Sequence, residues 1–129
     1  MNTKELMSRY SAGQRDFRNL NLMAANLRNL NLSGANLSGA NLTKANLTRT
    51  NLSHANLTDA IFVGANLTET NLTRANLNNA DLSQANLSDT NLSNALLRGT
   101  KMAGETTSSV ISDRRTVPQS VAAKVEGVL

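Results

Sequence analysis

The sequence predicts a solenoid with four sides to each coil, and its five-residue period is the first observation that indicates it. From Phe17 to Met102 every fifth residue is Leu or a large apolar substitute, and Asn or Asp precedes it in fifteen of eighteen pentads. A period of five matches neither the helical period of 3.6 residues nor the two-residue alternation of a strand. The leucines can share one interior only if the chain turns a corner in every pentad, so we expect coils that bury their faces against one another.

The number of sides follows from the residue two places before each leucine. This position is Ala in eleven pentads. Away from the two ends of the repeat, the residues that replace this Ala are Leu30, Thr50, Thr70 and Thr90, which are spaced by twenty residues. Twenty residues are four pentads, so a four-sided coil places these residues in one inward column. A buried Thr hydroxyl needs a partner, which a neighbouring hydroxyl or backbone group can supply. Small alanines elsewhere keep an interior filled by leucine dense without strain.

Tandem A(N/D)LXX motifs, such as ANLSGANLTKANLTRTNLSHANL at 35–57, resemble the pentapeptide-repeat family over residues 15–104. The resemblance implies an all-β fold, a right-handed quadrilateral parallel β-helix of about four and a half coils with a short N-terminal capping helix. The expected core contains the central residues of the pentads and the threonine column. Its members include Phe17, Leu37, Leu42, Leu47, Leu52, Leu57, Phe62, Leu67, Leu72 and Leu77, with Thr50, Thr70 and Thr90 as the inward column.

The segments on either side of the repeat do not follow its period. Residues 1–14 are expected to form a capping helix, because Leu6, Met7 and Tyr10 share one side of a helical turn. So short a helix should form only where it packs on something. Residues 105–129 are expected to hold a polar linker and then four valines at helical spacing. That last part is either a short helix, which caps the solenoid or contacts another chain, or a disordered tail.

Composition narrows the classes of function. The chain has no cysteine, which excludes disulfides, thiolate catalysis and cysteine zinc sites. Its net charge of +4 comes from scattered residues, whereas a nucleic-acid interface needs a dense basic face. No stretch approaches the ~20 apolar residues of a membrane span, and the N-terminus has no apolar run typical of a secretory signal. We therefore expect a cytoplasmic protein that contacts neither nucleic acid nor a membrane.

Catalytic and metal sites are not expected. His54 is the only histidine, and it should point outward without a second histidine or a carboxylate beside it. Glu69 and Asp89 are twenty residues apart and could stack, but on a convex corner that leaves both solvated. Arg49 could form an ion pair with Glu69 there. The sequence thus predicts no enzyme, no metal and no cofactor.

Ile61 and Val63 form the main interior irregularity of the repeat. Both should point outward, where neighbouring coils carry Asn, Asp, Thr or Ser. Exposed apolar residues on a polar surface can mark a contact site, although isolated ones are also normal. The first hypothesis is therefore a non-catalytic protein-interaction or regulatory module, whose partner is another protein of unknown identity and whose oligomeric state is unknown.

Two other functions fit this sequence less well. Some members of the family that the chain resembles act as DNA mimics that inhibit a topoisomerase such as DNA gyrase, which requires a strongly negative surface. Here the repeat carries eight basic and five acidic residues, so the sign is wrong. Flat faces with threonine ladders can bind ice, but the threonine column of this chain is expected to face inward.

Overall fold

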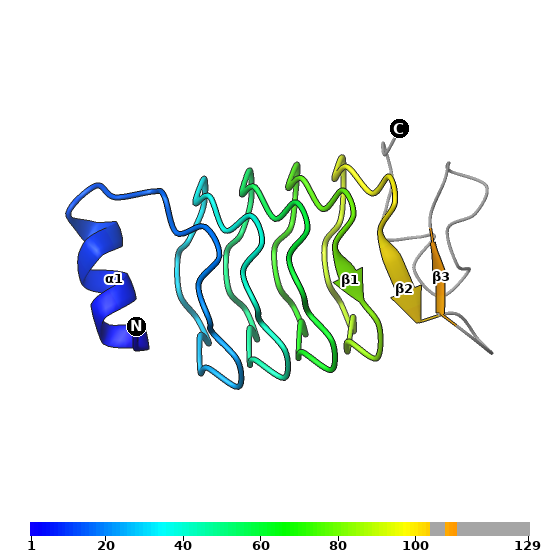
Figure 1. The fold of residues 1–129 in the computed structure, drawn as a ribbon, viewed down its shortest axis with the longest axis horizontal. Coiled ribbons are helices and arrows are strands. Elements are labelled where there is room, and N and C mark those ends of the chain that lie inside the picture. The colour runs from blue at the N-terminus through cyan, green and yellow to red at the C-terminus, as the bar shows by residue number, and fades with distance from the viewer. Residues whose placement is uncertain (104–107, 111–129) are drawn as a thin grey trace.

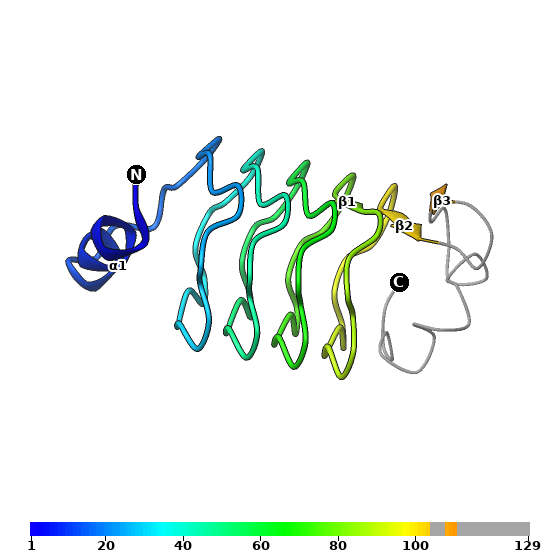
Figure 2. The same ribbon diagram turned by 90° about the horizontal axis from the view of Figure 1, so that it is seen from below.

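The computed structural model describes residues 1–103 and 108–110. Its named elements are helix α1 (Thr3–Ser11) and the strands β1 (Asp81–Leu82), β2 (Lys101–Ala103) and β3 (Ser108–Val110). Between α1 and β2 the chain winds as a row of stacked coils, with α1 beyond the first coil and β3 beyond the last (Figure 1). The view from below shows the same regular stack (Figure 2).

Successive coils are in register at twenty residues. Asn41 pairs in parallel with Ile61 and Ile61 with Asp81, and β1 continues this register to Lys101 of β2. On most sides of a coil only the residue before the leucine is paired, which explains why the named strands are so few and short. A register of twenty confirms the four-sided coil, whereas the expected total of about four and a half coils stays a prediction.

We number the four faces of the shaft in chain order. Their central residues are Phe17, Leu37, Leu57, Leu77 and Leu97 on face 1, Leu22, Leu42, Phe62, Leu82 and Met102 on face 2, Leu27, Leu47, Leu67 and Leu87 on face 3, and Leu32, Leu52, Leu72 and Leu92 on face 4. Strands β1 and β2 belong to face 2, and β3 pairs with β2 in antiparallel orientation.

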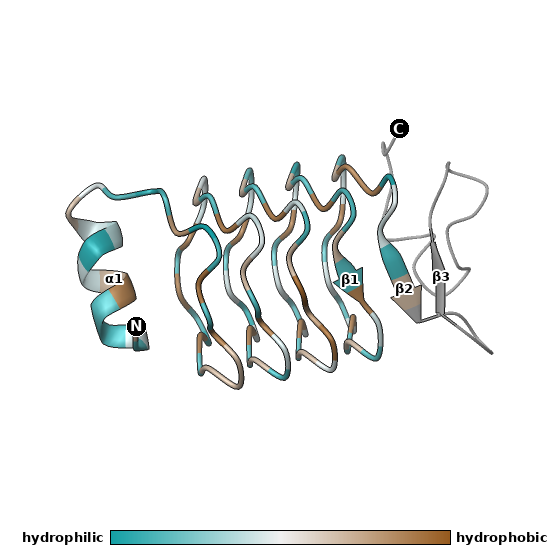
Figure 3. Ribbon diagram, viewed as in Figure 1, coloured by the Kyte–Doolittle hydropathy of each residue, from teal (hydrophilic) through white to brown (hydrophobic). Residues whose placement is uncertain are grey.

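The central residues of the pentads fill the interior of the shaft. All ten that the sequence singled out are at most 1% exposed. Figure 3 shows the result along each coil, where hydrophobic segments recur between hydrophilic ones. Burying each leucine contributes about 1.5–3 kcal/mol, so stability is distributed along the shaft rather than concentrated in one cluster.

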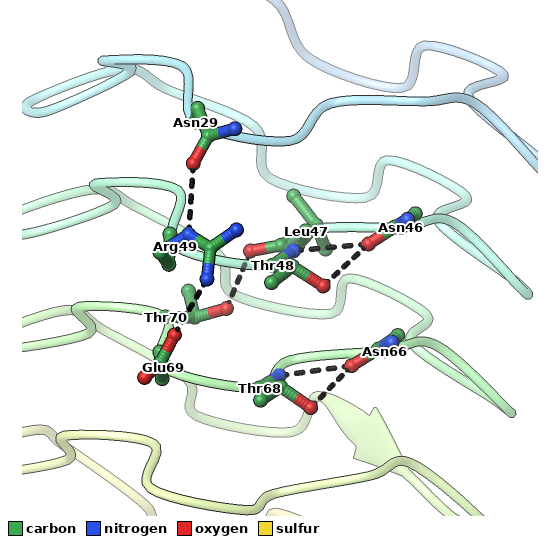
Figure 4. Close-up of polar contacts among 9 residues, drawn as sticks. All are labelled: Asn29, Asn46, Leu47, Thr48, Arg49, Asn66, Thr68, Glu69 and Thr70. Carbon is green, nitrogen blue, oxygen red and sulfur yellow. Dashed lines mark hydrogen bonds and ion pairs between the residues drawn. The ribbon is translucent and has the colours of Figure 1, made fainter.

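The threonine column is buried and bonded to backbone. Thr70 Oγ1 donates to the Leu47 carbonyl at 2.6 Å, which is drawn in Figure 4, and Thr90 Oγ1 donates to the Leu67 carbonyl at 2.7 Å. Thr50 makes the equivalent bond to Leu27. Each hydroxyl thus ties its coil to the coil before it, rather than bonding to the next threonine.

Substituting Thr70 with valine should lower the free energy of unfolding by about 1 kcal/mol, because one hydrogen bond is lost. The Leu47 carbonyl keeps the Thr50 N–H as a donor at 3.0 Å, which limits the loss. Urea unfolding followed by circular dichroism measures the change. Thr73→Val on the outside of face 4 is the matched control, and an equal loss there would show that the buried bond does not matter.

From Asn19 to Gly99, every corner of the shaft is a residue with left-handed backbone. The residue two places after each central residue has φ between 56° and 63° where it is not glycine, including Lys44, Arg49 and Glu69. The N–H of the residue directly after the corner closes the turn, as when Ala45 N–H, after the corner at Lys44, donates to the Leu42 carbonyl at 3.0 Å. A positive φ at this point is what a type II turn requires. The sequence signal was the excess of Gly, Asn and Asp at these positions, since these residues tolerate that conformation.

Two glycine corners offer a controlled comparison. Gly34 and Gly39 share φ of +71°, but a Cβ on Gly34 would meet nothing within 4 Å, whereas on Gly39 it would lie 2.1 Å from Asn19 Oδ1. Both alanine variants should lose about 1 kcal/mol to the left-handed backbone, and Gly39→Ala should lose more. Adding Asn19→Ala should bring Gly39→Ala back to the level of Gly34→Ala in thermal unfolding, and equal losses in the two single variants would contradict the contact.

Helix α1 covers the N-terminal end of the shaft. Asn2 caps it, since its side chain accepts the Glu5 N–H at 2.8 Å. Leu6 is fully buried in the core, and Tyr10 Oη donates to the Ser33 carbonyl at 2.6 Å. Thr3 adds a bond to the Asn26 carbonyl. A helix too short to be stable alone is thus held by the first coil.

The C-terminal end differs from the expectation in one respect. Ser108–Val110 falls within the predicted linker but forms β3, in which Val110 pairs with Lys101 and Ser108 with Ala103. The last coil therefore continues its backbone pairing into a strand of opposite direction. The helix or tail expected near the C-terminus lies outside the described residues.

Candidate interaction surface

Face 2 is the one on which apolar side chains gather on the outside of the shaft. The outward positions are the residues before and after each central residue. On faces 3 and 4 these positions hold only polar or charged residues, and on face 1 the single apolar exception is Leu96. Face 2 instead carries Met23, Ile61 and Val63; Met23 is 54% exposed, Ile61 is 39% exposed and Val63 is partly exposed.

The backbone of Ile61 and Val63 is bonded to the preceding coil, and that of Phe62 between them is bonded to the following coil through its N–H to the Asp81 carbonyl at 2.7 Å. Ile61 donates its N–H to the Ala40 carbonyl at 2.9 Å and accepts the Leu42 N–H at 2.7 Å. Between the pair, Phe62 is fully buried. Because side chains alternate along an extended segment, a buried Phe62 places both neighbours outside. The Ile61–Val63 pair is thus presented in a fixed orientation.

Outward asparagines have a local role that Ile61 cannot fill. In pentads with Asn or Asp before the central residue, its Oδ1 accepts the N–H two residues later, as Asn41 does for Thr43 at 3.1 Å. Figure 4 shows the same arrangement at Asn46 and Asn66, where the threonine hydroxyl also donates to this oxygen. These contacts are a feature of the repeat rather than a site.

The Val63 N–H consequently has no acceptor among residues 1–103 and 108–110. Leu96 is the other apolar residue that stands in place of Asn before a central residue. It differs from Ile61, because the N–H of Arg98, two residues after Leu96, donates to Asn78 Oδ1 at 2.9 Å. The Ile61–Val63 pair therefore combines two apolar side chains with an unused backbone donor.

Charged side chains elsewhere form surface pairs. Arg49 lies at the corner between faces 3 and 4, where it donates to Asn29 Oδ1 and to Glu69 Oε2, both at 3.1 Å (Figure 4). Both ionic partners are about half exposed, so the pair contributes at most about 1 kcal/mol. On face 1, hydrogen bonds from Arg18 hold the pKa of the Asp16 carboxyl below its ordinary value. Neither pair resembles a catalytic arrangement.

The other candidate residues are not brought together. His54 is exposed at the corner between faces 4 and 1. Within the described ranges, no three His, Cys, Asp or Glu residues come close enough to hold a metal ion. None of the helices in these ranges combines the length and apolar character that crossing a membrane requires.

Sequence reasoning found the Ile61–Val63 pair but missed two features of the same face. Met23 occupies the position equivalent to Val63 on the same face, two coils nearer the N-terminus. The sequence could have indicated this, because Met23, Thr43 and Val63 are spaced by the twenty residues of one coil. The free Val63 N–H could not be found, because the role of the asparagine oxygen is visible only once the side chains are placed.

Comparison with known proteins supports the family that the motifs indicated. The family model "Pentapeptide repeats" matches in eight copies over residues 21–59 and 60–99. The pentapeptide repeat protein alr5209 from Nostoc PCC 7120 is 38% identical, with 74% of this chain and 78% of that chain covered and a TM-score of 0.51. Comparison with curated proteins finds no match.

Two further solved structures are similar in sequence. HetL, a pentapeptide repeat protein involved in heterocyst differentiation regulation in the cyanobacterium Nostoc sp. strain PCC 7120, is 35% identical, covers 78% of this chain and has a TM-score of 0.41. This chain spans about half of HetL, 53% of its length. QnrB1, a plasmid-mediated fluoroquinolone resistance protein, is 24% identical over 88% of this chain and 56% of its own, with a TM-score of 0.43. The chain belongs to the pentapeptide-repeat family, whose fold is the right-handed quadrilateral β-helix.

Proposed function

We propose that this protein is a non-catalytic interaction or regulatory module that presents face 2 to another protein in the cytoplasm. The observation that carries the proposal is the Ile61–Val63 pair, which replaces outward polar side chains with apolar ones and leaves the Val63 N–H unused in the described part. A partner that covers the pair gains apolar burial and can place a carbonyl on that donor. A chain without cysteine is compatible with a reducing compartment.

The rigidity of the shaft supports this role. Inter-coil hydrogen bonds of 2.7–2.9 Å hold the backbone of Ile61 and Phe62 on both sides. Binding to a surface that is already ordered avoids the entropic cost of fixing loops and side chains. A small apolar pair on such a shaft can therefore contribute more to affinity than the same residues on a loop.

The alternative role, a DNA-mimic inhibitor of DNA gyrase, has no observation in its favour. The repeat carries eight basic and five acidic residues. Two of those acidic residues, Asp16 and Glu69, are paired with Arg18 and Arg49. A partner that binds duplex DNA would meet an excess of positive charge on this shaft, and like charges in an interface cost several kcal/mol.

The double substitution Ile61→Asn and Val63→Ser should abolish partner capture and leave the fold intact. Asn at 61 restores the oxygen that accepts the N–H of residue 63, as Asn41 does for Thr43. The measurement is affinity capture from the native host, with wild type and variant compared by quantitative mass spectrometry. Proteins held through face 2 should fall to the background of an empty resin.

The matched control is Asn71→Asp with Thr73→Ser on the opposite face. Aspartate can fill the same local role, since Asp81 Oδ1 accepts the Ser83 N–H at 2.9 Å. This variant should capture the same proteins as wild type. Identical capture by wild type and by the face-2 variant would contradict the proposed surface.

A further inference from the structure

We infer that face 2 binds an extended segment of its partner in which apolar side chains stand between a basic and an acidic one. The inference rests on the proposed function, because it describes the partner segment that covers the Ile61–Val63 pair. The observation that carries it is the charge on the two corners that border face 2. Between residues 19 and 99 each of these corners holds a single charged residue, and the two charges have opposite signs.

The corner between faces 1 and 2 supplies negative charge beside Ile61. Its residues are Asn19, Gly39, Asp59, Asn79 and Gly99. The charged one, Asp59, is exposed and lies two residues before Ile61. Asp81, which pairs with Ile61 from the next coil, adds a second carboxylate, and its Oδ1 accepts the Ser83 N–H at 2.9 Å. Within residues 1–103 and 108–110 neither carboxylate has an ion-pair partner, so a basic side chain of the partner can pair with either.

The corner between faces 2 and 3 supplies positive charge beside Val63. Its residues up to position 99 are Ala24, Lys44, Gly64 and Gln84. Gly64 follows Val63 directly, and a Cβ built on Gly64 would lie 3.4 Å from Lys44 Cγ. The stem of Lys44 therefore runs over Gly64, which leaves its ammonium group on the side of face 2 where Val63 lies. Lys44 is exposed and forms no ion pair with another described residue, so it is available to an acidic side chain.

The outward groups cross face 2 at the interval of an extended chain. Asp59, Ile61 and Val63 are spaced by two residues, and side chains two residues apart on one side of an extended chain are about 6.6 Å apart. An extended partner segment that lies along this coil presents its own side chains at the same interval. In the described part the Val63 N–H is unused, so it can donate to a carbonyl of that segment. The order that fits is basic, apolar, apolar and acidic at every second residue.

The size of face 2 favours such a segment over a second copy of the chain. From Asn21 to Lys101 the face is about 20 Å long, at about 4.8 Å for each coil. Residues 59–64 cross it in about 16 Å, so its area is about 300 Å². This is well below the ~800 Å² that each partner buries in a stable interface. An extended segment needs only the coil that carries the pair.

A random peptide library displayed on phage tests the inference, because it contains the possible orders of charge without bias. Multivalent display also makes weak binding measurable. The library is selected on the immobilised full chain, and the clones that lose binding to the Ile61→Asn, Val63→Ser variant are scored. Their sequences should carry Lys or Arg on one side of an apolar pair and Asp or Glu on the other. Asp59→Asn and Lys44→Gln should each weaken these clones about two- to fivefold, the effect of one exposed ion pair.

Charge reversal gives a sharper result. Asp59→Lys with Asp81→Asn leaves no carboxylate beside Ile61. Both replacements fit the repeat, since Lys44 already occupies a corner and Asn is the usual residue before a central residue. Clones selected on this variant should carry an acidic residue in place of the basic one. Asp89→Lys on the corner between faces 3 and 4 is the matched control, and it should select the same sequences as wild type.

The inference is overturned if the scored clones carry no basic residue, if charge reversal leaves their sequences unchanged, or if no clone depends on the pair. Self-association of wild type in sedimentation, lost in Asp59→Lys, would assign face 2 to a second copy and overturn it as well. The proposed function is judged separately by capture from the host. Lost capture in the Ile61→Asn, Val63→Ser variant together with clones of the wrong charge would overturn this inference alone. Unchanged capture together with clones of the expected charge order would contradict the proposed function alone.

Discussion

Phe62→Ala is expected to lower the free energy of unfolding by about 3–5 kcal/mol, the usual cost of removing a buried phenylalanine. Phe62 has no exposed surface and lies in the face-2 column between Leu42 and Leu82. Its segment is tied to the coils on both sides, since Phe62 N–H donates to the Asp81 carbonyl at 2.7 Å and Ile61 N–H donates to the Ala40 carbonyl at 2.9 Å. The walls of the cavity therefore cannot close, and the cost should lie in the upper part of this range.

Phe62→Leu is the informative partner of this variant. It places at 62 the residue that the neighbouring rows already carry, and it removes much less buried volume than Phe62→Ala, so it should cost clearly less. Urea unfolding followed by far-ultraviolet circular dichroism separates the two. A small loss in Phe62→Ala would show that the coil collapses around the gap, and a large loss in Phe62→Leu would show that the ring itself shapes face 2. Phe62→Leu should also keep the capture that depends on Ile61 and Val63.

The coil could be predicted from the sequence because the packing of its interior restricts which side chains can occupy the inward positions. The interior accepts apolar residues and threonines whose hydroxyl is hydrogen-bonded, so the period of five is visible in the leucines, and the threonines at 50, 70 and 90 carry the period of twenty. Corners are different, because their constraint acts on the backbone. Lys44 and Glu69 adopt a left-handed φ because the coil must close there, although neither residue type prefers it.

The two ends could be predicted only in part, for a related reason. The helix near the N-terminus is visible in the spacing of Leu6, Met7 and Tyr10, and the structure places it at Thr3–Ser11. Strand β3 has no such pattern, since Ser108–Val110 is short and follows polar residues. Strand β3 forms because the edge of β2 lies beside it in space and offers unpaired backbone groups. The residues of β3 alone give no sign of this neighbour.

The candidate surface shows the same division. A break in the repeat identified Ile61 and Val63 directly. The difference between this break and the one at Leu96 was not predictable, because it depends on where the Asn78 side chain points. Asn78 Oδ1 accepts the Arg98 N–H and compensates for Leu96, whereas Thr43 Oγ1 donates to Asn41 Oδ1 and leaves the Val63 N–H without an acceptor in the described part.

Leu6→Ala is expected to release helix α1 and open the first coil. Removing a fully buried leucine costs about 2–5 kcal/mol, and a helix of nine residues is marginal once its packing is lost. In a stack where each coil contacts only its neighbours, the damage should stay near the end. Amide hydrogen exchange should therefore accelerate at Phe17 and Leu22, whose N–H groups donate to Asn36 and Asn41, and remain slow at Leu72.

Tyr10→Phe separates the packing of α1 from its hydrogen bonding. This variant loses only the 2.6 Å bond to the Ser33 carbonyl, so it should cost about 1 kcal/mol and leave the first coil protected. Equal acceleration at Leu72 in Leu6→Ala would mean that the coils unfold as one unit and that α1 stabilises the whole shaft. Acceleration confined to Phe17 and Leu22 would instead show that α1 protects an exposed backbone edge, which is the hazard that an open coil presents.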